Sequence, residues 1–579
     1  MARAFKFLGP LFAGTAFAIG VLAAAAPAQA DNAPAARAAA ARHPAVAHKG
    51  AIASAYPLAS QAGQEILEEG GNAFDAAVAV SAALAVVEPS SSGLGGGGFY
   101  LLHRQSDGFE TMLDAREKAP GAASRDMYLD KSGNEIANAS TSGPLSAAIP
   151  GEPAAFEYLA RKYGKLPLKQ SLQPAIRLAR EGFPLYARLQ YGIKAKRDIL
   201  ARSPDAAKAF LTADGNVPEI GAIIKQPELA KTLEAIAAQG ARGFYEGRVA
   251  ENLVAGVRAG GGIWTLEDLK NYRVVERKPL VGEYHGARIV TASPPSSGGI
   301  AVLDSLNILA GFDLQTQDSA TRKHLIIEAM RRAYRDRAIF LGDPDFIKMP
   351  LQQLMSVDYA AGQRSSIRAD KAMPSDLLPG IESEPKGMNT THFSVLDAAG
   401  NRAAVTITVN LFFGNGYMPA GTGVLLNNEM DDFSTKPGRP NVFGLIGNTA
   451  NSIAPNKRSL SSMSPTFVET PKGLMIIGSP GGSTIISQVL LGVLNYEDGM
   501  NAADIVKYPH YHHQYLPDEV TYEPGALSDA EIQELQAKGH KLKLSTRQWG
   551  NMQVITWDFA TGKVEAASDP RGEGEGLVY

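Results

Sequence analysis

A predicted β-hairpin around residue 400 strongly restricts the fold. Residues 391–397 and 402–410 each alternate apolar and polar side chains, and the connection between them reads AAGN. Alternation with a period of two is typical of a β-strand, and a short connection with glycine and asparagine favours an antiparallel pair. We therefore expect a fold that contains an antiparallel sheet.

Helices are predicted between two groups of strands. Further strand-like segments are 99–103, 111–114, 474–478 and 552–557. Apolar residues recur at helical spacing in 59–67, 73–87, 171–181, 319–341 and 485–495. Strands towards both ends of this region with helices between them favour a layered α/β sandwich with antiparallel sheet.

One predicted helix, 319–341, carries a basic stripe. Residues 328–337 read EAMRRAYRDR and include an i, i+4 pair of arginines, with Glu328 and Asp336 nearby. Arginine stripes of this kind are usually solvated or lie at an interface. We expect the same of this helix face.

The composition is that of a soluble globular protein. Of the 579 residues, 45% are hydrophobic and 20% are charged, and the formal net charge at pH 7 is −3. Lysines and arginines are dispersed rather than gathered into a run that could neutralise phosphates, so nucleic acid is not an expected partner. The absence of cysteine excludes disulfides, thiol catalysis and cysteine-bound zinc.

The first thirty residues have the features of a cleavable export signal. Arg3 and Lys6 precede a long alanine-rich apolar stretch, and residues 28–30 read AQA, the small-x-small pattern that signal peptidases accept. We expect cleavage after Ala30 and a periplasmic or secreted protein without a membrane span. The alternative is an uncleaved membrane anchor, because the apolar stretch approaches spanning length.

Two motifs could indicate a cofactor or a metal, but the residues around them argue against both. The glycine run at 93–98 fits G-x-G-x-x-G, but a predicted helix precedes it and a strand follows, the reverse of a dinucleotide site. A tight backbone crossing near the core explains it better. His510, His512 and His513 lack a carboxylate at helical offset and are expected to be structural. No cofactor and no metal are therefore expected.

Three other motifs contain the groups of a binding site. The segment LNNEMDDF, 426–433, either recognises a cationic group such as a substrate ammonium through its carboxylates or is a solvated acidic turn. The segments KRSLSSMSP and GSPGGS offer hydroxyls and flexible backbone N–H groups, which are the materials of an anion or oxyanion site.

An acyl-transfer enzyme with this sequence would need an unusual nucleophile. These serine motifs contain no G-x-S-x-G elbow, and the chain has no thiol. A threonine at a chain N-terminus carries its own base, because its α-amino group has a reference pKa of about 7.7 to 8.0. The pair Thr390-Thr391 could supply such a residue only if the peptide bond before it were cleaved; otherwise it is two β-branched strand residues.

Taken together, the motifs resemble those of the γ-glutamyltransferase proenzymes, also called glutathione hydrolases, over essentially the whole mature length. The matching stretches are GGNAFDAAVA, EPSSSGLGGGGF, LDAREKAP, PPSSGG, NTTHFSVLD, VTITVN, LLNNEMDDFS, PNKRSLSSMSPT, GSPGGS, HHQYLPDE and ASDPR. The resemblance implies an N-terminal nucleophile hydrolase, that is, a four-layer αββα sandwich that cuts itself into two subunits.

The resemblance also implies the position of the cut and the domain organisation. Alignment of NTTHFSVLD places the cut between Asn389 and Thr390. After a signal peptide at 1–30, the large subunit would span 31–389, with an alanine-rich leader to about residue 50 and a linker at about 373–389. The small subunit would span 390–579, and the two would form a heterodimer.

Site residues carry over from the family one position at a time. The resemblance makes Thr390 the nucleophile, Thr408 the residue that orients its amine, and Gly481 and Gly482 the donors of backbone N–H groups to the oxyanion. A second group would bind the γ-glutamyl zwitterion: Arg116, Ser461 and Ser462 at its α-carboxylate, and Asn410, Glu429 and Asp432 at its α-ammonium.

The implied reaction is cleavage of the γ-glutamyl amide bond of glutathione and related compounds through a γ-glutamyl-threonine ester. Water or an amino acid or peptide acceptor would then take the group. Two rivals remain: a cephalosporin or glutaryl acylase of the same superfamily, and a periplasmic binding protein without turnover.

Two positions depart from bacterial relatives. Glu429 stands where many have Gln, which makes the ammonium pocket more acidic. Phe443 stands where an enteric-type enzyme has Tyr, so a gating hydrogen bond to Asn410 is not available.

Overall fold

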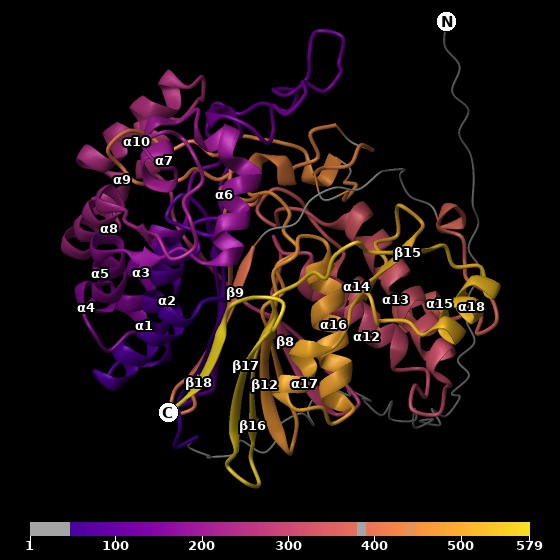
Figure 1. Ribbon diagram of the computed structural model, residues 1–579. Coiled ribbons are helices and arrows are strands. Elements are labelled where there is room, and N and C mark those ends of the chain that lie inside the picture. The colour runs from indigo at the N-terminus through magenta and orange to yellow at the C-terminus, as the bar shows by residue number, and fades with distance from the viewer. Residues whose placement is uncertain (1–46, 379–389, 437, 443, 448) are drawn as a thin grey trace, which may run out of the picture. The chain divides into compact units, whose positions relative to one another are not determined.

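The computed structural model describes residues 47–378, 390–436, 438–442, 444–447 and 449–579 (Figure 1). The predicted signal peptide, most of the leader, the end of the linker with Asn389, and Phe443 lie outside the described residues.

The predicted hairpin forms the centre of a seven-stranded antiparallel sheet, in the order β18-β1-β9-β10-β2-β3-β6. The hairpin strands β9 and β10 pair along their length, with Thr391 opposite Ile407. The prediction of an antiparallel sheet is therefore confirmed. The strands are β1 (Ala51–Ser54), β2 (Gly97–Arg104), β3 (Phe109–Ala115), β6 (Val275–Arg277), β9 (Thr391–Leu396), β10 (Arg402–Thr408) and β18 (Glu575–Val578).

A second sheet, of six strands in the order β17-β16-β12-β11-β8-β7, packs on the first. Its strands β12 and β16 contact the hairpin strands β9 and β10 of the first sheet. The strands are β7 (Leu280–Tyr284), β8 (Ala287–Thr291), β11 (Thr466–Glu469), β12 (Gly473–Gly478), β16 (Gln553–Asp558) and β17 (Val564–Ser568).

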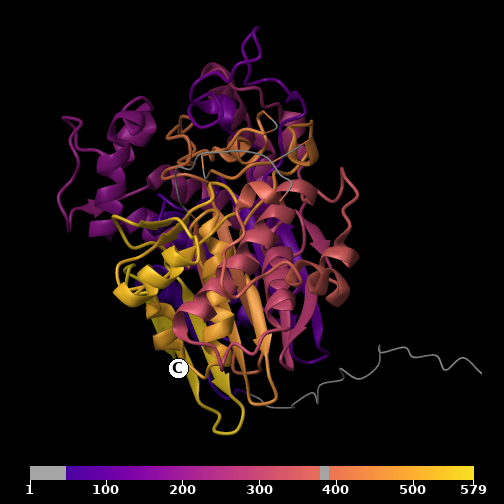
Figure 2. The ribbon, with the colours of Figure 1, turned by 90° about the vertical axis from the view of Figure 1, so that its right-hand side faces the viewer.

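Helices cover the outer face of each sheet. Against the first sheet lies α2 with its neighbours: α1 (Pro57–Glu68), α2 (Ala73–Val87), α3 (Glu152–Lys162), α5 (Gln173–Glu181) and α8 (Pro227–Gln239). The second sheet is covered by α12 (Gly298–Leu309), α13 (Ser319–Phe340), α16 (Thr484–Glu497) and α17 (Ala502–Lys507), which face the viewer in Figure 2. The predicted four-layer αββα sandwich is confirmed.

The sequence of α2 shows why this layer forms. Its fifteen residues, AFDAAVAVSAALAVV, are all buried, as expected of a helix that is apolar on every side. Its first turn is closed by a capping box, in which the Asn72 side chain accepts from backbone N–H groups and Asp75 accepts from the Asn72 N–H.

The remaining elements are shorter or lie at the periphery. The helices are α4 (Leu168–Ser171), α6 (Ala187–Leu200), α7 (Pro204–Phe210), α9 (Arg242–Tyr245), α10 (Gly247–Ala259), α11 (Leu266–Lys270), α14 (Leu351–Leu354), α15 (Val357–Arg364) and α18 (Asp529–Ala537). The strands are β4 (Phe183–Pro184), β5 (Ile223–Ile224), β13 (Tyr511–His512), β14 (Val520–Tyr522) and β15 (Leu542–Leu544). The 3₁₀ turns are η1 (Pro144–Ser146), η2 (Ser375–Leu377), η3 (Glu429–Asp432) and η4 (Thr449–Asn451).

The basic stripe of α13 was expected to be solvated or to lie at an interface, and the solvated alternative is wrong. Glu328, Arg331 and Arg332 are almost completely buried. Glu328 accepts from Arg331 Nε at 3.1 Å and from Arg332 Nη1 at 2.7 Å, so its charge is matched inside the protein. The described residues after α15 complete this environment, because Ser366 and Ser375 accept hydrogen bonds from the same arginines.

Among the described helices, none has both the length and the apolar character that crossing a membrane requires.

Candidate active site

One pocket gathers almost all the residues that the sequence singled out. Its lining consists of Arg116, Arg337, Thr390, Thr408, Asn410, Glu429, Asp432, Leu445, Leu460, Ser461, Ser462, Met463, Gly482 and Ile485. Of the ten predicted site residues only Gly481 is not part of the lining, and it precedes Gly482 directly.

Strand ends bring the two threonines together. Strand β9 begins at Thr391 and β10 ends at Thr408, so Thr390 and Thr408 lie at the same end of the hairpin. Their Oγ1 atoms lie 3.4 Å apart, and Thr390 is only 5% exposed. The Asn410 N–H donates to Thr408 Oγ1 at 2.8 Å, which fixes that hydroxyl beside Thr390. Thr391 faces the other side of the strand, away from this pair.

The glycine run before β2 lets the backbone pass close to this end of the hairpin. A Cβ on Gly96 would lie 2.0 Å from the Thr408 carbonyl oxygen, and one on Gly95 would lie 1.9 Å from the Leu425 carbonyl oxygen. No side chain fits at such distances. The prediction of a tight backbone crossing is therefore confirmed, and the crossing packs directly behind Thr408.

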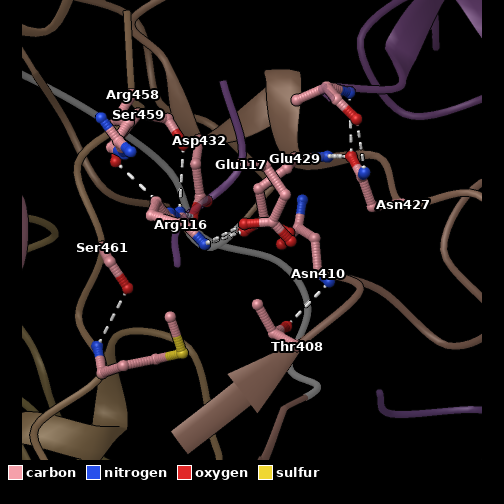
Figure 3. Close-up of polar contacts among 12 residues, drawn as sticks. Arg116, Glu117, Thr408, Asn410, Asn427, Glu429, Asp432, Arg458, Ser459 and Ser461 are labelled. Atoms are coloured by element: carbon pink, nitrogen blue, oxygen red, sulfur yellow. Dashed lines mark hydrogen bonds and ion pairs between the residues drawn. The ribbon is translucent and has the colours of Figure 1, made fainter. Parts of the chain in front are cut away.

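Arg116 is the most buried cation of the pocket. It follows the last residue of β3, and its side chain is 1% exposed. Its guanidinium donates to Glu429 and to Asp432, and its Nη1 lies 3.7 Å from Glu117 (Figure 3). These carboxylates raise the pKa of Arg116 against the effect of burial, which lowers it.

The acidic cluster forms the turn η3, and only part of it faces the pocket. Glu429 is 1% exposed, and burial raises the pKa of its carboxyl. Asp431 points elsewhere, because its carboxylate accepts from Ser140 Oγ at 2.7 Å and from the Val442 N–H at 3.0 Å. The alternative of a solvated acidic turn is therefore wrong.

Asn410 adopts a conformation that few residues other than glycine tolerate. Its φ is +74°, in the left-handed region that asparagine accepts more readily than most residues. Its Nδ2 donates to the Asn428 carbonyl at 2.8 Å. Figure 3 shows the Asn410 side chain beside Thr408 and Glu429. The strained backbone thus turns the amide into the pocket next to the acids.

The two serines lie on a loop that rests against the PPSSGG turn. The Ser461 N–H donates to the Pro295 carbonyl at 2.9 Å, and the Ser297 N–H donates to the Ser461 carbonyl at 2.8 Å. Both pocket serines are buried, at 2% and 7% exposure for Ser461 and Ser462. Backbone hydrogen bonds therefore hold the loop in place. Ser461 Oγ accepts from the Met463 N–H at 3.2 Å and Ser462 Oγ accepts from Arg337 Nη2 at 3.4 Å, and as acceptors both hydroxyls can still donate to a ligand.

The glycine pair follows the second sheet. Gly481 and Gly482 connect the end of β12 to the start of α16, with φ of +138° and +56°. Backbone N–H groups ahead of a helix N-terminus favour negative charge. A Cβ on Gly481 would lie 2.5 Å from Thr484 Oγ1, so the local packing also requires glycine.

The candidate metal ligands are already engaged with other groups. His512 Nδ1 lies 2.9 Å from Ser487 Oγ, and His513 Nε2 lies 3.2 Å from Asp518. Elsewhere in the described chain, His324, Glu328 and His540 bring ligand atoms within 4.8 Å of one another. Two arginines already neutralise Glu328, which makes this a poor cation site.

Sequence reasoning missed Arg337, which also lines the pocket. It assigned the arginines of α13 to one face that is solvated or lies at an interface. At about 3.6 residues per turn, however, positions 331, 332, 335 and 337 cannot share a face. This spacing was the signal that at least one of them points inward.

Comparisons with known proteins identify the family of the chain. The model of the family "Gamma-glutamyltranspeptidase" matches residues 59–579. The glutathione hydrolase proenzyme of Escherichia coli K12 is 43% identical over 530 residues, covering 91% of each chain. That of Pseudomonas sp. strain A14 is 45% identical over 501 residues, covering 86% of this chain and 87% of the relative.

Solved structures give the same family and superfamily. A cephalosporin acylase from Bacillus halodurans has a TM-score of 0.80 at 29% identity, covering 91% of this chain and 95% of its own. The gamma-glutamyltranspeptidase of Helicobacter pylori has a TM-score of 0.55 at 41% identity, covering 56% of this chain and 94% of the matched one.

Proposed function

The chain belongs to the gamma-glutamyltranspeptidase family, and we propose that it cleaves γ-glutamyl amide bonds with Thr390 as the nucleophile. Donors are glutathione and related γ-glutamyl compounds, and acceptors are water, amino acids or peptides. The observation that carries the proposal is the position of Thr390. Its hydroxyl lies 3.4 Å from that of Thr408, in a pocket lined by Arg116, Glu429 and Asp432.

The nucleophile is created by cleavage between Asn389 and Thr390. The new α-amino group, with a reference pKa of about 7.7 to 8.0, then sits on the residue whose hydroxyl it must deprotonate. Thr408 keeps that residue in place. The cut separates residues 31–389 from residues 390–579.

Strand order explains why the two subunits would remain together as a heterodimer. In the first sheet, β9 and β10 of the small subunit lie between β1 and β2 of the large one. The small-subunit strand β18 also pairs with β1, and in the second sheet β11 of the small subunit pairs with β8 of the large one. Separation would break these two backbone ladders together with β1–β9 and β2–β10, and their donors and acceptors would lose their partners. The heterodimer is thus one sandwich with one interrupted chain.

The first half of the reaction forms the acyl-enzyme. The Thr390 oxygen attacks the γ-carbonyl carbon while its proton passes to the α-amine, and negative charge develops on the carbonyl oxygen. The N–H groups of Gly481 and Gly482 stabilise that oxyanion. The C–N bond then breaks, the amine leaves with the proton, and a γ-glutamyl ester remains on Thr390.

The second half transfers the group. Water or the neutral amine of an acceptor attacks the ester carbonyl and passes a proton to the α-amine of Thr390 as the new bond forms; the bond to the threonine oxygen then breaks, and that oxygen takes the proton back from the α-amine. Water yields glutamate, and an amino acid or peptide yields a new γ-glutamyl amide. Both outcomes use the same oxyanion site.

Charges of both signs at the pocket fit the α-carbon of a γ-glutamyl group. Glu429, Asp432 and the amide of Asn410 offer acceptors to an ammonium, whereas Arg116, Ser461 and Ser462 offer donors to a carboxylate. A glutaryl group has the same length but no ammonium. The buried acids therefore favour a γ-glutamyl donor over the acyl group of a glutaryl acylase.

A pair of neighbouring aspartates tests donor choice. Asp432→Asn removes a pocket charge, so we expect kcat/KM for γ-glutamyl-p-nitroanilide to fall about 10- to 100-fold, the cost of one charged hydrogen bond. Asp431→Asn is the matched control, because Asp431 binds Ser140 outside the pocket. If the parent enzyme hydrolysed glutaryl-p-nitroanilide and left the γ-glutamyl compound intact, the acylase assignment would replace ours.

Export is also proposed. The sequence of residues 1–30 supports removal of a signal peptide. Amino-terminal sequencing of the large subunit from a periplasmic fraction or culture medium is expected to begin at Asp31, and a chain that retains residue 1 would contradict export by cleavage.

A further inference from the structure

Arg337 lies near the C-terminal end of α13 and lines the active-site pocket. Its side chain reaches the loop that carries the two pocket serines. Nε donates to Ser297 Oγ at 2.9 Å, and Nη2 donates to Ser462 Oγ at 3.4 Å. The residue is 5% exposed, so its charge is held out of bulk water.

The two pocket arginines differ in how their charge is balanced. Arg116 faces three carboxylates, from Glu117, Glu429 and Asp432. Within the described part of the chain, the partners of Arg337 are two serine hydroxyls, and no carboxylate pairs with it. Burial lowers the pKa of Arg337 to about 10, while Tyr334 and Asp432 raise it. The side chain is therefore still a cation at neutral pH.

A buried cation without a paired anion is unfavourable unless something compensates it. The proposed substrate brings one anion to this pocket, its α-carboxylate. On the acidic side of the pocket, Glu429 and Asp432 already share Arg116 and would repel that carboxylate. Ser462, which lines the same pocket, connects it to Arg337.

We propose that Arg337 is a second carboxylate-binding residue, which together with Ser462 receives the α-carboxylate of the γ-glutamyl donor. The inference rests on the proposed γ-glutamyl function and refines it. Arg116 then lies between the two ends of the zwitterion, with the acids at the ammonium and Arg337 at the carboxylate. Specificity for an α-carboxylate comes from both guanidinium groups.

A purely structural role for Arg337 makes a different prediction. Hydrogen bonds to Ser297 and Ser462 would hold the serine loop, and a neutral donor could make them too. Loss of such a role would affect every donor equally. A carboxylate-binding role affects only donors that carry an α-carboxylate.

The experiment compares two donors that differ in this group alone. These are γ-glutamyl-p-nitroanilide and γ-aminobutyryl-p-nitroanilide, which keeps the ammonium and lacks the carboxylate. We expect Arg337→Gln to lower the ratio of their kcat/KM values about 10- to 100-fold, as for one charged hydrogen bond. Arg337→Lys keeps the charge and loses the planar fork, so its ratio is expected to lie between the ratios of the parent enzyme and Arg337→Gln.

Arg335→Gln is the matched control on the same helix. Its Nη1 donates to Asp336, and it is not part of the pocket lining, so the ratio should stay unchanged. Equal losses on both donors in the Arg337 variants would overturn the inference. If the parent enzyme turns over the second donor too slowly, the ratio of inhibition constants for glutamate and γ-aminobutyrate replaces it.

The readout of folding is the appearance of a small subunit that begins at Thr390. If neither Arg337 variant is processed, Ser297→Ala is used, because it removes the acceptor of Arg337 Nε without changing the pocket lining. A ratio that does not fall in that variant would contradict the inference. Failure of the parent enzyme on every γ-glutamyl donor would instead refute the proposed function itself.

Discussion

The substitution Thr408→Val tests what one oxygen atom, Thr408 Oγ1, contributes to stability and what it contributes to self-cleavage and turnover. Valine keeps the shape of threonine and removes Oγ1, which lies 3.4 Å from Thr390 Oγ1 and accepts the Asn410 N–H at 2.8 Å. The lost acceptor leaves a buried N–H unpaired, at a cost of about 1–3 kcal/mol of unfolding free energy. Loss of the contact to Thr390 is expected, in addition, to lower the rates of self-cleavage and turnover by a constant factor.

That factor follows from the energy of one hydrogen bond. A neutral bond contributes about 0.5–1.5 kcal/mol and one to a charged group about 1.5–3 kcal/mol, so we expect rates to fall roughly 10- to 100-fold. The assays are the time course of small-subunit formation and kcat/KM of the processed fraction. Thr408→Ser keeps the oxygen and is expected to restore both.

The matched control is Thr406→Val, on the same strand and the same face. Thr406 Oγ1 lies 2.8 Å from His392 Nδ1, so its loss costs similar stability but does not touch the pocket. We expect a comparable drop in melting temperature with normal processing. Equal slowing of processing in both variants, or none in Thr408→Val, would refute the role of Thr408.

Two further predictions concern the surroundings of the site. Burial raises the pKa of Glu152 to about 8 from its ordinary value of 4.5, although Ser81 Oγ donates to its carboxyl at 2.7 Å. Because the folded state holds this proton more tightly, stability should fall as the pH rises through this interval. Glu152→Gln should remove this pH dependence, which amounts to up to about 5 kcal/mol of unfolding free energy. The melting temperature of the variant relative to the parent should therefore be higher at pH 9 than at pH 4. Gly96→Ala should prevent folding or processing, because its Cβ would lie 2.0 Å from the Thr408 carbonyl oxygen; the matched change Gly362→Ala meets nothing within 4 Å and should be tolerated. A processed, fully active Gly96→Ala enzyme, or a Glu152→Gln effect of the same size at both pH values, would contradict these accounts.

The sequence predicted the architecture well because its signals are local. Alternation in 391–397 and 402–410 predicts a hairpin, and the almost entirely apolar run at 73–87 predicts a helix that is buried on every side. The glycine run was interpreted correctly from the order of elements around it, since no helix follows to receive a phosphate. Each of these conclusions needs only neighbours along the chain.

The electrostatics could not be predicted in the same way. Whether Glu328 or Arg331 is solvated depends on segments that are far away in sequence and fold over them. The contact of Arg116 with Glu429 joins residues more than three hundred positions apart. A residue type indicates that a charge is present, but only the tertiary structure determines which partner neutralises it.

The site residues were found through the resemblance, and the structure adds their grouping. Thr390 and Thr408 are close because antiparallel pairing brings the start of one strand to the end of the next. Arg337 was missed because its motif, AYRDR, resembles an exposed helix face. A buried arginine is recognised only when the environment of its guanidinium group is known.

The central claim is that Thr390 becomes a chain terminus and carries the γ-glutamyl group. Intact mass spectrometry of the purified protein, before and after an acid quench of turnover with γ-glutamyl-p-nitroanilide, measures both events. We predict a small subunit that begins at Thr390 and, after the quench, a fraction heavier by one γ-glutamyl group on that residue, with neither event in Thr390→Ala. A single uncut chain that still hydrolyses the donor, or a γ-glutamyl group attached elsewhere, would contradict the account.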